Sequence, residues 1–348
     1  MSGFNNFKVL GAAAAISLLA GCSGGGSASL TPKPISVGSA SHRVPFVLKL
    51  LGARGPNAVA LHHYKSFDAC PANGPIKYVS DYNNNVVDLF VGKFAGQAPC
   101  GRITSEINSP WGLYVEPRTH DLYVANDGGK NILVFHRGQT SPYNTYTDPT
   151  GQDPVDVTVA RDGTVIASNL VRENLQENGS ISTWVGGPNG GTFVGNFATA
   201  NGGEGQFVTV QKDGTVFFDD LIGNTANGAL FYLSCPGGAC GPQTQVAGVS
   251  FTLPGGLESN DNDDLLANDG LGFADTFKLP NPNPKTFPVT GIPTGMAINK
   301  LDHHWFVADG LNNDAAEYLY PGGKLVGTIQ GNPDGGTFGI AVDPGHTR

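Results

Sequence analysis

The sequence predicts an all-β fold, a six-bladed β-propeller built of four-stranded blades. Two observations predict it: one strand pattern recurs six times, and a C-terminal segment matches a strand that the first repeat lacks. The composition agrees, because 50 glycines and 24 prolines among 348 residues supply many turns, and only 14% of the residues are charged. Repeats of this length are typical of propellers, in which each repeat forms one small sheet.

Each repeat contains an apolar strand that ends in Asp or Asn, and neighbouring end residues are about 41 to 51 positions apart. A loop rich in glycine or asparagine follows this strand, and a further strand follows the loop. In the last five repeats another apolar strand comes first, joined in two of them by the hairpin-forming turns "RDG" and "KDG". Short apolar runs such as "KLVGTIQ", 324–330, would supply the fourth strand. The six end residues are Asp81, Asn126, Asn169, Asp220, Asn268 and Asp309.

The first repeat lacks its inner strand, because "CPANGPIK" precedes "YVSD" where the other repeats have an apolar strand. The segment "FGIAVDP", 338–344, resembles "TGMAINK", 294–300, which is the inner strand of the sixth repeat. We therefore expect the C-terminal strand to complete the first blade and close the ring. A closed ring leaves no sheet edge exposed for pairing with other chains.

Residues 1–21 predict a signal peptide. Lys8 provides a positive charge, and the apolar stretch 9–20 is shorter than the roughly 20 residues that cross a bilayer. The residues "LAGC", 19–22, resemble the lipobox of bacterial lipoproteins. This resemblance implies cleavage before Cys22 and attachment of a lipid to its thiol. We therefore expect an extracytoplasmic protein of the bacterial cell envelope, lipid-anchored to a membrane.

The segment 22–40 is rich in glycine, serine and proline and predicts a flexible tether behind the lipidated cysteine. We expect residues 41–75 to pack on the propeller as an N-terminal segment. The propeller itself would then take residues 76–348.

The remaining four cysteines predict two disulfides, since disulfides persist outside the cytoplasm. Four cysteines permit three pairings, of which we favour Cys235–Cys240, across the tight turn "CPGGAC", and Cys70–Cys100. A four-cysteine metal site is the alternative, but the spacings do not match those of zinc-ligand pairs.

The stretch "GLYVEPRTHDLYVANDGGKNILVFHRG", 112–138, resembles the repeat of the NHL family of β-propellers, and weaker copies extend over residues 76–344. This resemblance implies the propeller fold. It does not imply one function, because the family includes scaffolds, RNA-binding modules, lyases and lactonase-like enzymes.

A candidate ligand site lies on the predicted propeller axis. Aligned inner strands place Asp156 and Phe207 at a position where the other four blades have glycine, and Trp111 lies beside it. Arg172 and Glu173 belong to a neighbouring loop that could reach over this position. Because four glycines would leave room, we expect a recessed cavity suited to a polar, ring-shaped ligand. The alternative is a water-filled channel. The four glycines are Gly112, Gly256, Gly295 and Gly339.

A distant similarity to lactonases of the SMP-30 type implies a second possibility, a divalent cation such as Ca²⁺ or Zn²⁺ at the channel. Asn126, Asn169 and Asp220 have suitable side chains for its ligands, but the glutamate ligand of that family has no counterpart here. Alternatively, these residues accept backbone hydrogen bonds where loops begin.

The formal charge of −9 and the absence of a basic cluster argue against a nucleic-acid partner. No nucleophile elbow, Walker loop or zinc-protease motif occurs. We expect a monomeric, cofactor-free protein whose propeller face binds a protein, a glycan or a small polar ligand. A metal-assisted hydrolase or lyase that uses the channel is the alternative, and no catalytic residue can be assigned.

Overall fold

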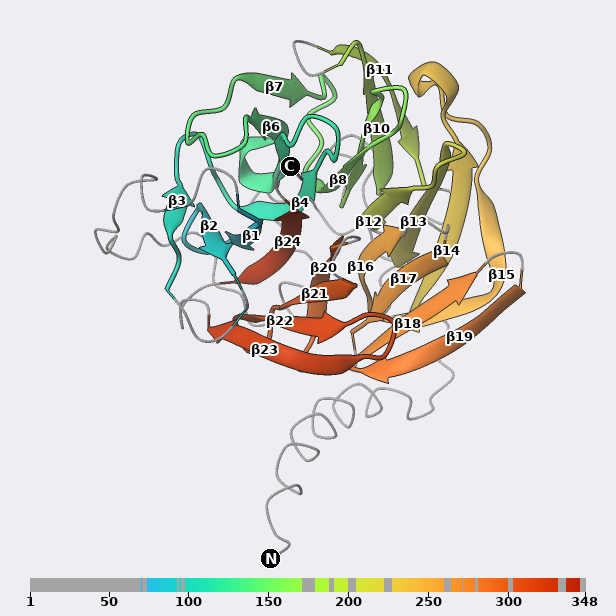
Figure 1. Cartoon of the computed structure of the whole chain (residues 1–348). Coiled ribbons are helices and arrows are strands. Elements are labelled where there is room, and N and C mark those ends of the chain that lie inside the picture. Colours follow the sequence, from blue (N-terminus) through green and yellow to red (C-terminus); the bar gives the residue numbers. More distant parts are fainter. Residues whose placement is uncertain are drawn as a thin grey trace, which may run out of the picture. The chain divides into compact units, whose positions relative to one another are not determined.

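Six antiparallel sheets follow one another along the chain and surround a common axis in the computed structural model (Figure 1). The chain divides into two units, residues 1–44 and 45–348, and every described residue belongs to the second. The structure describes residues 70, 74–92, 94, 98–170, 179–187, 191–199, 205–221, 227–259, 264–270, 272–278, 281–299, 303–330 and 336–344. The expectations for 1–21, for the tether 22–40 with Cys22, and for most of 41–75 therefore lie outside the described residues.

Each sheet is one blade, named here from its innermost strand outward. Blade 1 contains β24 (Thr337–Asp343), β1 (Ile76–Asp81), β2 (Val86–Val91) and β3 (Gly101–Ile103). Blade 2 contains β4 (Pro110–Val115), β5 (Leu122–Asn126), β6 (Asn131–Phe135) and β7 (Asn144–Thr147). Blade 3 contains β8 (Pro154–Val159), β9 (Val165–Asn169), β10 (Ser180–Val185) and β11 (Thr192–Ala198).

Blade 4 contains β12 (Gly205–Val210), β13 (Thr215–Leu221), β14 (Asn227–Ser234) and β15 (Thr244–Thr252). Blade 5 contains β16 (Pro254–Ser259), β17 (Asp264–Asp269), β18 (Phe273–Lys278) and β19 (Asn281–Pro288). Blade 6 contains β20 (Pro293–Asn299), β21 (His304–Asp309), β22 (Asp314–Leu319) and β23 (Lys324–Gln330). Two short 3₁₀ turns are also described, η2 (Asp127–Gly129) and η3 (Pro236–Gly238). The predicted six-bladed, all-β propeller is confirmed.

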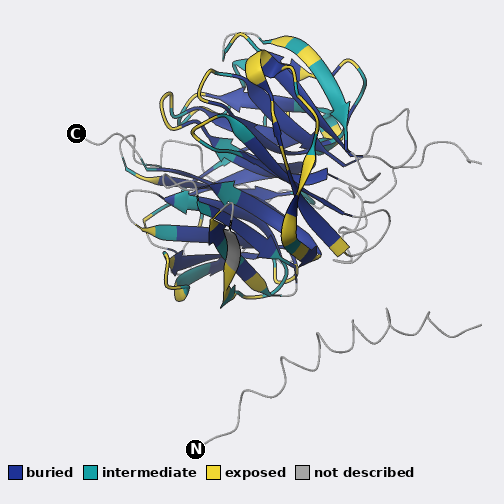
Figure 2. Ribbon diagram, turned by 90° about the vertical axis from the view of Figure 1, so that its right-hand side faces the viewer, coloured by how far each residue is buried: buried dark blue, intermediate teal, exposed yellow. Residues whose placement is uncertain are grey.

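The core lies between neighbouring blades, where the inner and middle strands of each sheet face the next sheet (Figure 2). Between blades 1 and 2, for example, Tyr78 and Leu89 belong to the same cluster as Val124 and Leu133. Apolar residues therefore occupy both faces of the central strands, and these strands read in the sequence as nearly continuous apolar runs.

The C-terminal strand β24 closes the ring, as the sequence predicts. It pairs antiparallel with β1, so that Tyr78 lies opposite Ala341. The buried carboxylate of Asp343 at its end accepts a hydrogen bond from Arg137 of blade 2, and His120 of blade 2 lies 2.8 Å from it. Blade 1 is thus joined within its own sheet and held to blade 2 by the ion pair with Arg137 and the polar contact with His120.

The two ends of the channel differ in the connections that surround them. On one side, here named the loop face, lie the connections between second and third strands, such as 82–85 and 127–130. On the other side, here named the turn face, lie the turns between first and second strands, such as 116–121, 160–164 and 211–214. The six Asp or Asn end residues all lie on the loop face, since each is the last or the next-to-last residue of a second strand.

Both predicted disulfides are present, Cys70–Cys100 and Cys235–Cys240. Disulfides of this kind form in oxidising compartments, which indicates an extracytoplasmic location. Within the described residues, none of the helices has the length and apolar character that a membrane crossing requires.

Candidate functional site

The residues aligned at the axis do meet around a central void. Its walls come from all six inner strands, with Leu257 in place of the expected Gly256 on β16, and the space between them holds about one water molecule. The void is lined by Gly112, Leu113, Asp156, Phe207, Leu257, Gly295, Met296, Gly339 and Ile340. The axis at this depth therefore has no space for a ring-shaped ligand.

The glycines explain why the void is so small. A Cβ added at Gly112 would clash with the Asp156 carboxylate, and one added at Gly339 would clash with the backbone carbonyl of Trp111. The space that a side chain would take is filled by the neighbouring inner strand. The glycines thus allow strands of adjacent blades to approach closely and do not leave the room that the sequence suggested.

Asp156 and Asp219 hold the main chain of β12 from two adjacent blades. Asp156 Oδ2 accepts a hydrogen bond from Val208 N at 3.0 Å, and Asp219 Oδ1 accepts one from Phe207 N at 2.8 Å. Both carboxyl groups are buried, and this burial raises the pKa of each well above its usual range. Asp156 therefore lies on the axis as expected, and its carboxyl group supports the irregular β12 strand.

Two of the three alternative metal ligands form hydrogen bonds within the fold. Asn126 Oδ1 accepts a hydrogen bond from Asn108 N at 2.6 Å, and Asn169 Nδ2 donates one to Ser182 Oγ at 2.8 Å. Asp220 is buried on the next blade, with 1% of its surface exposed. Among the residues that the structure describes, no group of three His, Cys, Asp or Glu side chains is placed to hold a metal ion.

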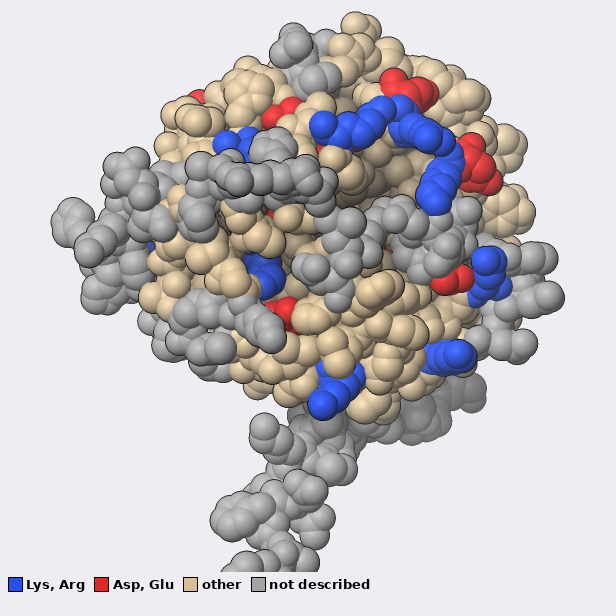
Figure 3. Space-filling view, in the orientation of Figure 1, with Lys and Arg blue, Asp and Glu red and all other residues tan. Residues whose placement is uncertain are grey.

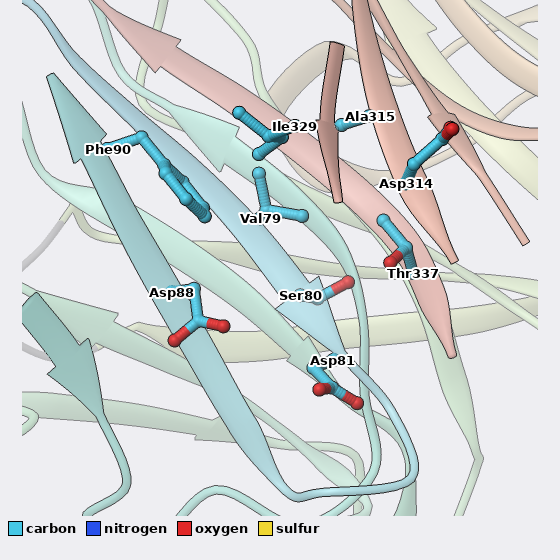
Figure 4. Close-up of a pocket in the computed structure, with 9 residues that line it drawn as sticks. All are labelled: Val79, Ser80, Asp81, Asp88, Phe90, Asp314, Ala315, Ile329 and Thr337. Atoms are coloured by element: carbon cyan, nitrogen blue, oxygen red, sulfur yellow. The ribbon is translucent and has the colours of Figure 1, made fainter. Parts of the chain in front are cut away.

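A second water-sized void lies between blades 1 and 6, and three aspartates line it (Figure 4). Asp88 is bound by two hydrogen bonds from Arg102, and Asp81 accepts hydrogen bonds from Asn84. Burial raises the pKa of both carboxyl groups, and hydrogen bonds partly offset this effect. These bonds hold the strand end and the outer strand of blade 1. The third aspartate is Asp314.

A partly exposed polar cluster, here named the loop-face cluster, joins blades 1, 2 and 3. Tyr82 donates its hydroxyl hydrogen to Asp127 Oδ2 at 3.0 Å, and Lys130 Nζ lies 3.4 Å from Asp153 Oδ1. All four residues are half-buried. Burial and the nearby Asp153 carboxylate raise the pKa of Asp127 to about 7, although Tyr82 and Lys130 oppose the shift. The cluster therefore combines a carboxyl group that titrates near neutrality with fixed donors and acceptors.

Aromatic rings lie beneath the loop-face cluster. Trp111 packs with its ring centre 5.7 Å from that of Tyr82 and 4.8 Å from that of Phe338. The indole is fully buried, and its Nε1–H has no hydrogen-bond partner among the residues that the structure describes. A buried donor without a hydrogen-bond partner costs free energy. An ordered water or a polar group of a ligand would therefore be stabilised there. Trp111, expected at the axis, thus lies under the rim between blades 1 and 2.

Sequence reasoning did not select Tyr82, Asp127 or Lys130. A signal for the first two exists, because each directly follows a strand-ending residue, Asp81 or Asn126, in two consecutive repeats. Arg172 and Glu173, which were expected to reach over the site, lie outside the described residues.

Comparisons with known proteins agree with the fold. No protein-family model matches the chain, and no curated protein matches it. One chain of a nidogen–laminin complex is 13% identical with a TM-score of 0.60, and the match covers 77% of this chain and 98% of that one. A protein of unknown function from Bacteroides caccae is 12% identical with a TM-score of 0.58, over 77% and 98% of the two chains.

A functionally unknown protein from Desulfotomaculum acetoxidans is 11% identical with a TM-score of 0.55, and the match covers 78% of this chain and 99% of that one. Likeness at such low identity shows the fold alone. Fold and disulfides together define an extracytoplasmic, six-bladed β-propeller.

Proposed function

We propose that this chain is a binding lipoprotein of the bacterial cell envelope, of NHL type and anchored through Cys22, whose loop face holds a glycan or a similar small polar ligand. The observation that supports this proposal is the loop-face cluster, in which the Tyr82–Asp127 pair adjoins the Lys130–Asp153 pair above the buried Trp111 ring. No covalent chemistry is part of the proposal.

The chemistry of the cluster suits a ligand with several hydroxyl groups. A sugar hydroxyl both donates and accepts, and the cluster offers carboxylate acceptors, an ammonium donor and a phenol held in fixed positions. Ligand sites in proteins commonly combine apolar or aromatic surface with a few such polar groups. At the depth of the water-sized void the axis has no room for a sugar ring, so the proposal places the ligand at the rim of the channel.

The proposal is tested with a panel of neutral disaccharides and short glycans, titrated into the purified full-length chain while tryptophan fluorescence and heat are recorded. At least one member of the panel should bind and change the fluorescence, because Trp111 lies against Tyr82. Tyr82→Phe and Asp127→Asn should each weaken this binding about tenfold, the value of one or two lost charge-assisted hydrogen bonds.

Tyr232→Phe is the matched control, since it makes the same chemical change on a half-exposed tyrosine of blade 4. It should bind like the parent chain. If no glycan binds, or if Tyr232→Phe weakens binding as much as Tyr82→Phe does, the loop-face cluster is not a glycan site.

A further inference from the structure

The turn face carries one exposed cation on each of three consecutive inner turns. Arg118, Arg161 and Lys212 lie in the connections between the first and second strands of blades 2, 3 and 4. These turns surround the axis, because each leaves the innermost strand of its blade and these innermost strands pack side by side. Figure 3 shows Lys and Arg side chains gathered in a crescent along one edge of a hollow on the face toward the viewer.

Arg161 and Lys212 occupy the same position in two copies of one turn. Gly163 N donates to Ala160 O at 2.9 Å, and the equivalent bond from Gly214 N to Gln211 O is 3.0 Å long. Both glycines have a φ of 88°, a conformation that glycine adopts readily. The turn thus requires the glycine, and it leaves the side chains of Arg161 and Lys212 exposed.

The acidic residues of these two turns serve the turns themselves. Asp162 Oδ1 accepts a hydrogen bond from Thr164 N at 2.9 Å, and Asp213 Oδ1 accepts one from Thr215 N at 2.8 Å. Their carboxylates are therefore directed toward their own main chain. In Figure 3 the acidic side chains near the crescent lie on its outer side, away from the hollow.

Arg118 is held beside the turn of the next blade. One of its terminal nitrogens donates to the carbonyl oxygen of Arg161 at 2.7 Å, and its Nε donates to the buried Glu116 at 2.5 Å. Its side chain nevertheless remains 55% exposed. Arg118 is therefore fixed in place next to the turn that carries Arg161.

One further carboxylate at this end of the channel, that of Glu258, lies deeper than the three cations. Glu258 lies in the inner strand β16. After burial, its carboxylate is the strongest cause of the raised pKa of Tyr114 in β4. Tyr114 precedes the turn that carries Arg118 by two strand positions. An anion would thus be repelled from this part of the channel wall.

We propose that Arg118, Arg161 and Lys212 form an anion-binding rim on the turn face, for a ligand that carries two or more phosphate groups. Cations fixed at neighbouring positions bind a multiply charged anion better than a single charge does, because each contact adds to the others. This rim is independent of the glycan site proposed for the loop face, since it lies at the opposite end of the channel. The same chemistry is found in free polyphosphates and in clustered anionic lipid headgroups.

Two probes distinguish these sources: inorganic tripolyphosphate, measured by calorimetry, and vesicles of anionic phospholipid compared with vesicles of neutral phospholipid, measured by co-sedimentation. The full-length chain should bind one of the two anionic probes, and added salt should weaken this binding. Binding of tripolyphosphate would assign a free anion, and binding of anionic vesicles alone would assign lipid headgroups.

The double variant Arg161→Gln/Lys212→Gln should bind that probe about tenfold more weakly, the effect of losing two exposed ion pairs. Its thermal unfolding should match that of the parent, because both side chains are exposed. Lys278→Gln/Lys324→Gln removes the same charge from exposed positions on blades 5 and 6 and should leave binding unchanged. The proposal would be overturned if neither anionic probe binds, or if the two double variants lose equal affinity.

Discussion

The carboxyl group of Asp127 shows how neighbouring blades set the chemistry of a single residue. Burial and the Asp153 carboxylate disfavour its charged form, while the Tyr82 hydroxyl and the Lys130 ammonium favour it. The balance leaves a pKa of about 7, against 3.8 for an unperturbed aspartate. A group with this pKa changes its charge within the physiological range, so the loop-face cluster is sensitive to pH.

Replacing Asp127 with Asn should change how stability depends on pH. Between about pH 4 and pH 7 the unfolded chain has released the Asp127 proton and the folded chain still binds it, so this carboxyl group lowers stability progressively as the pH rises. Above about pH 7 its effect is constant. Asp127→Asn removes the contribution, and its free energy of unfolding relative to the parent should therefore increase across that window. Urea denaturation at a series of pH values measures this difference.

Tyr82→Phe provides the complementary variant. It removes the hydrogen bond that favours the charged form of Asp127, so the pKa of Asp127 should rise and the stability decline should extend to higher pH. Profiles of the parent and of both variants that run parallel over the whole range would contradict this account of Asp127.

The sequence could not have predicted this residue-scale chemistry. It identified the strand-ending Asp81 and Asn126, because they recur at a fixed place in each repeat. The pair Tyr82 and Asp127 forms only because blades 1 and 2 place two loops side by side. A repeat pattern gives the place of a residue within its own blade and carries no information on which atoms of the next blade it meets.

The positions of the inner strands were predicted correctly, but the space beside their glycines was not. Alignment placed Gly112 and Gly339 correctly at the axis. An absent side chain suggested empty space, but the structure shows that the backbone of the adjacent strand occupies it. Sequence patterns report which strands are inner, and the distance between two inner strands depends on packing around the whole ring. For this reason the ligand cavity expected at the axis could not be judged from the sequence.

Gly112→Ala tests how closely these strands pack. The added methyl group would collide with the Asp156 carboxylate and the Val155 carbonyl, so two inner strands would have to separate. We expect a loss of about 1–3 kcal/mol in the free energy of unfolding, measured by chemical denaturation. Gly322→Ala is the control, because a Cβ there meets no atom within 4 Å. Equal losses in the two variants would show that the inner strands are not in contact at Gly112.

At the scale of the whole molecule, stability depends on closing the ring. The buried Asp343 carboxylate connects the last strand to Arg137 and His120 of blade 2. Removing one partner of a buried ion pair leaves the other charge unsatisfied, which commonly costs about 3–5 kcal/mol. The sequence predicted the closing strand from its resemblance to the other inner strands. It did not predict the contact of Asp343 with Arg137 and His120, because a repeat within one blade does not show which residues of the next blade it meets.

Asp343→Ala should therefore lower the free energy of unfolding by about 3 kcal/mol, and amide hydrogens of β1 should exchange faster than in the parent chain. Asp264→Ala removes an aspartate that pairs with Lys278 on an exposed part of blade 5, and it should cost less than about 1 kcal/mol. If the two variants lose similar stability, the contact of Asp343 with blade 2 does not hold the ring closed.

The pairing of β24 with β1 also dictates an order of events during biosynthesis. Gly339 N and the Ser80 Oγ to which it donates are 259 positions apart, so the ribosome delivers β1 long before its partner strand. Until β24 is synthesised, the inner edge of β1 has unpaired main-chain groups that could pair with a strand of another chain. Residues 76–81 would thus be a binding site for a chaperone that protects nascent chains. A chain truncated before β24 would keep this edge of β1 unpaired. Such a chain would be prone to aggregation or degradation.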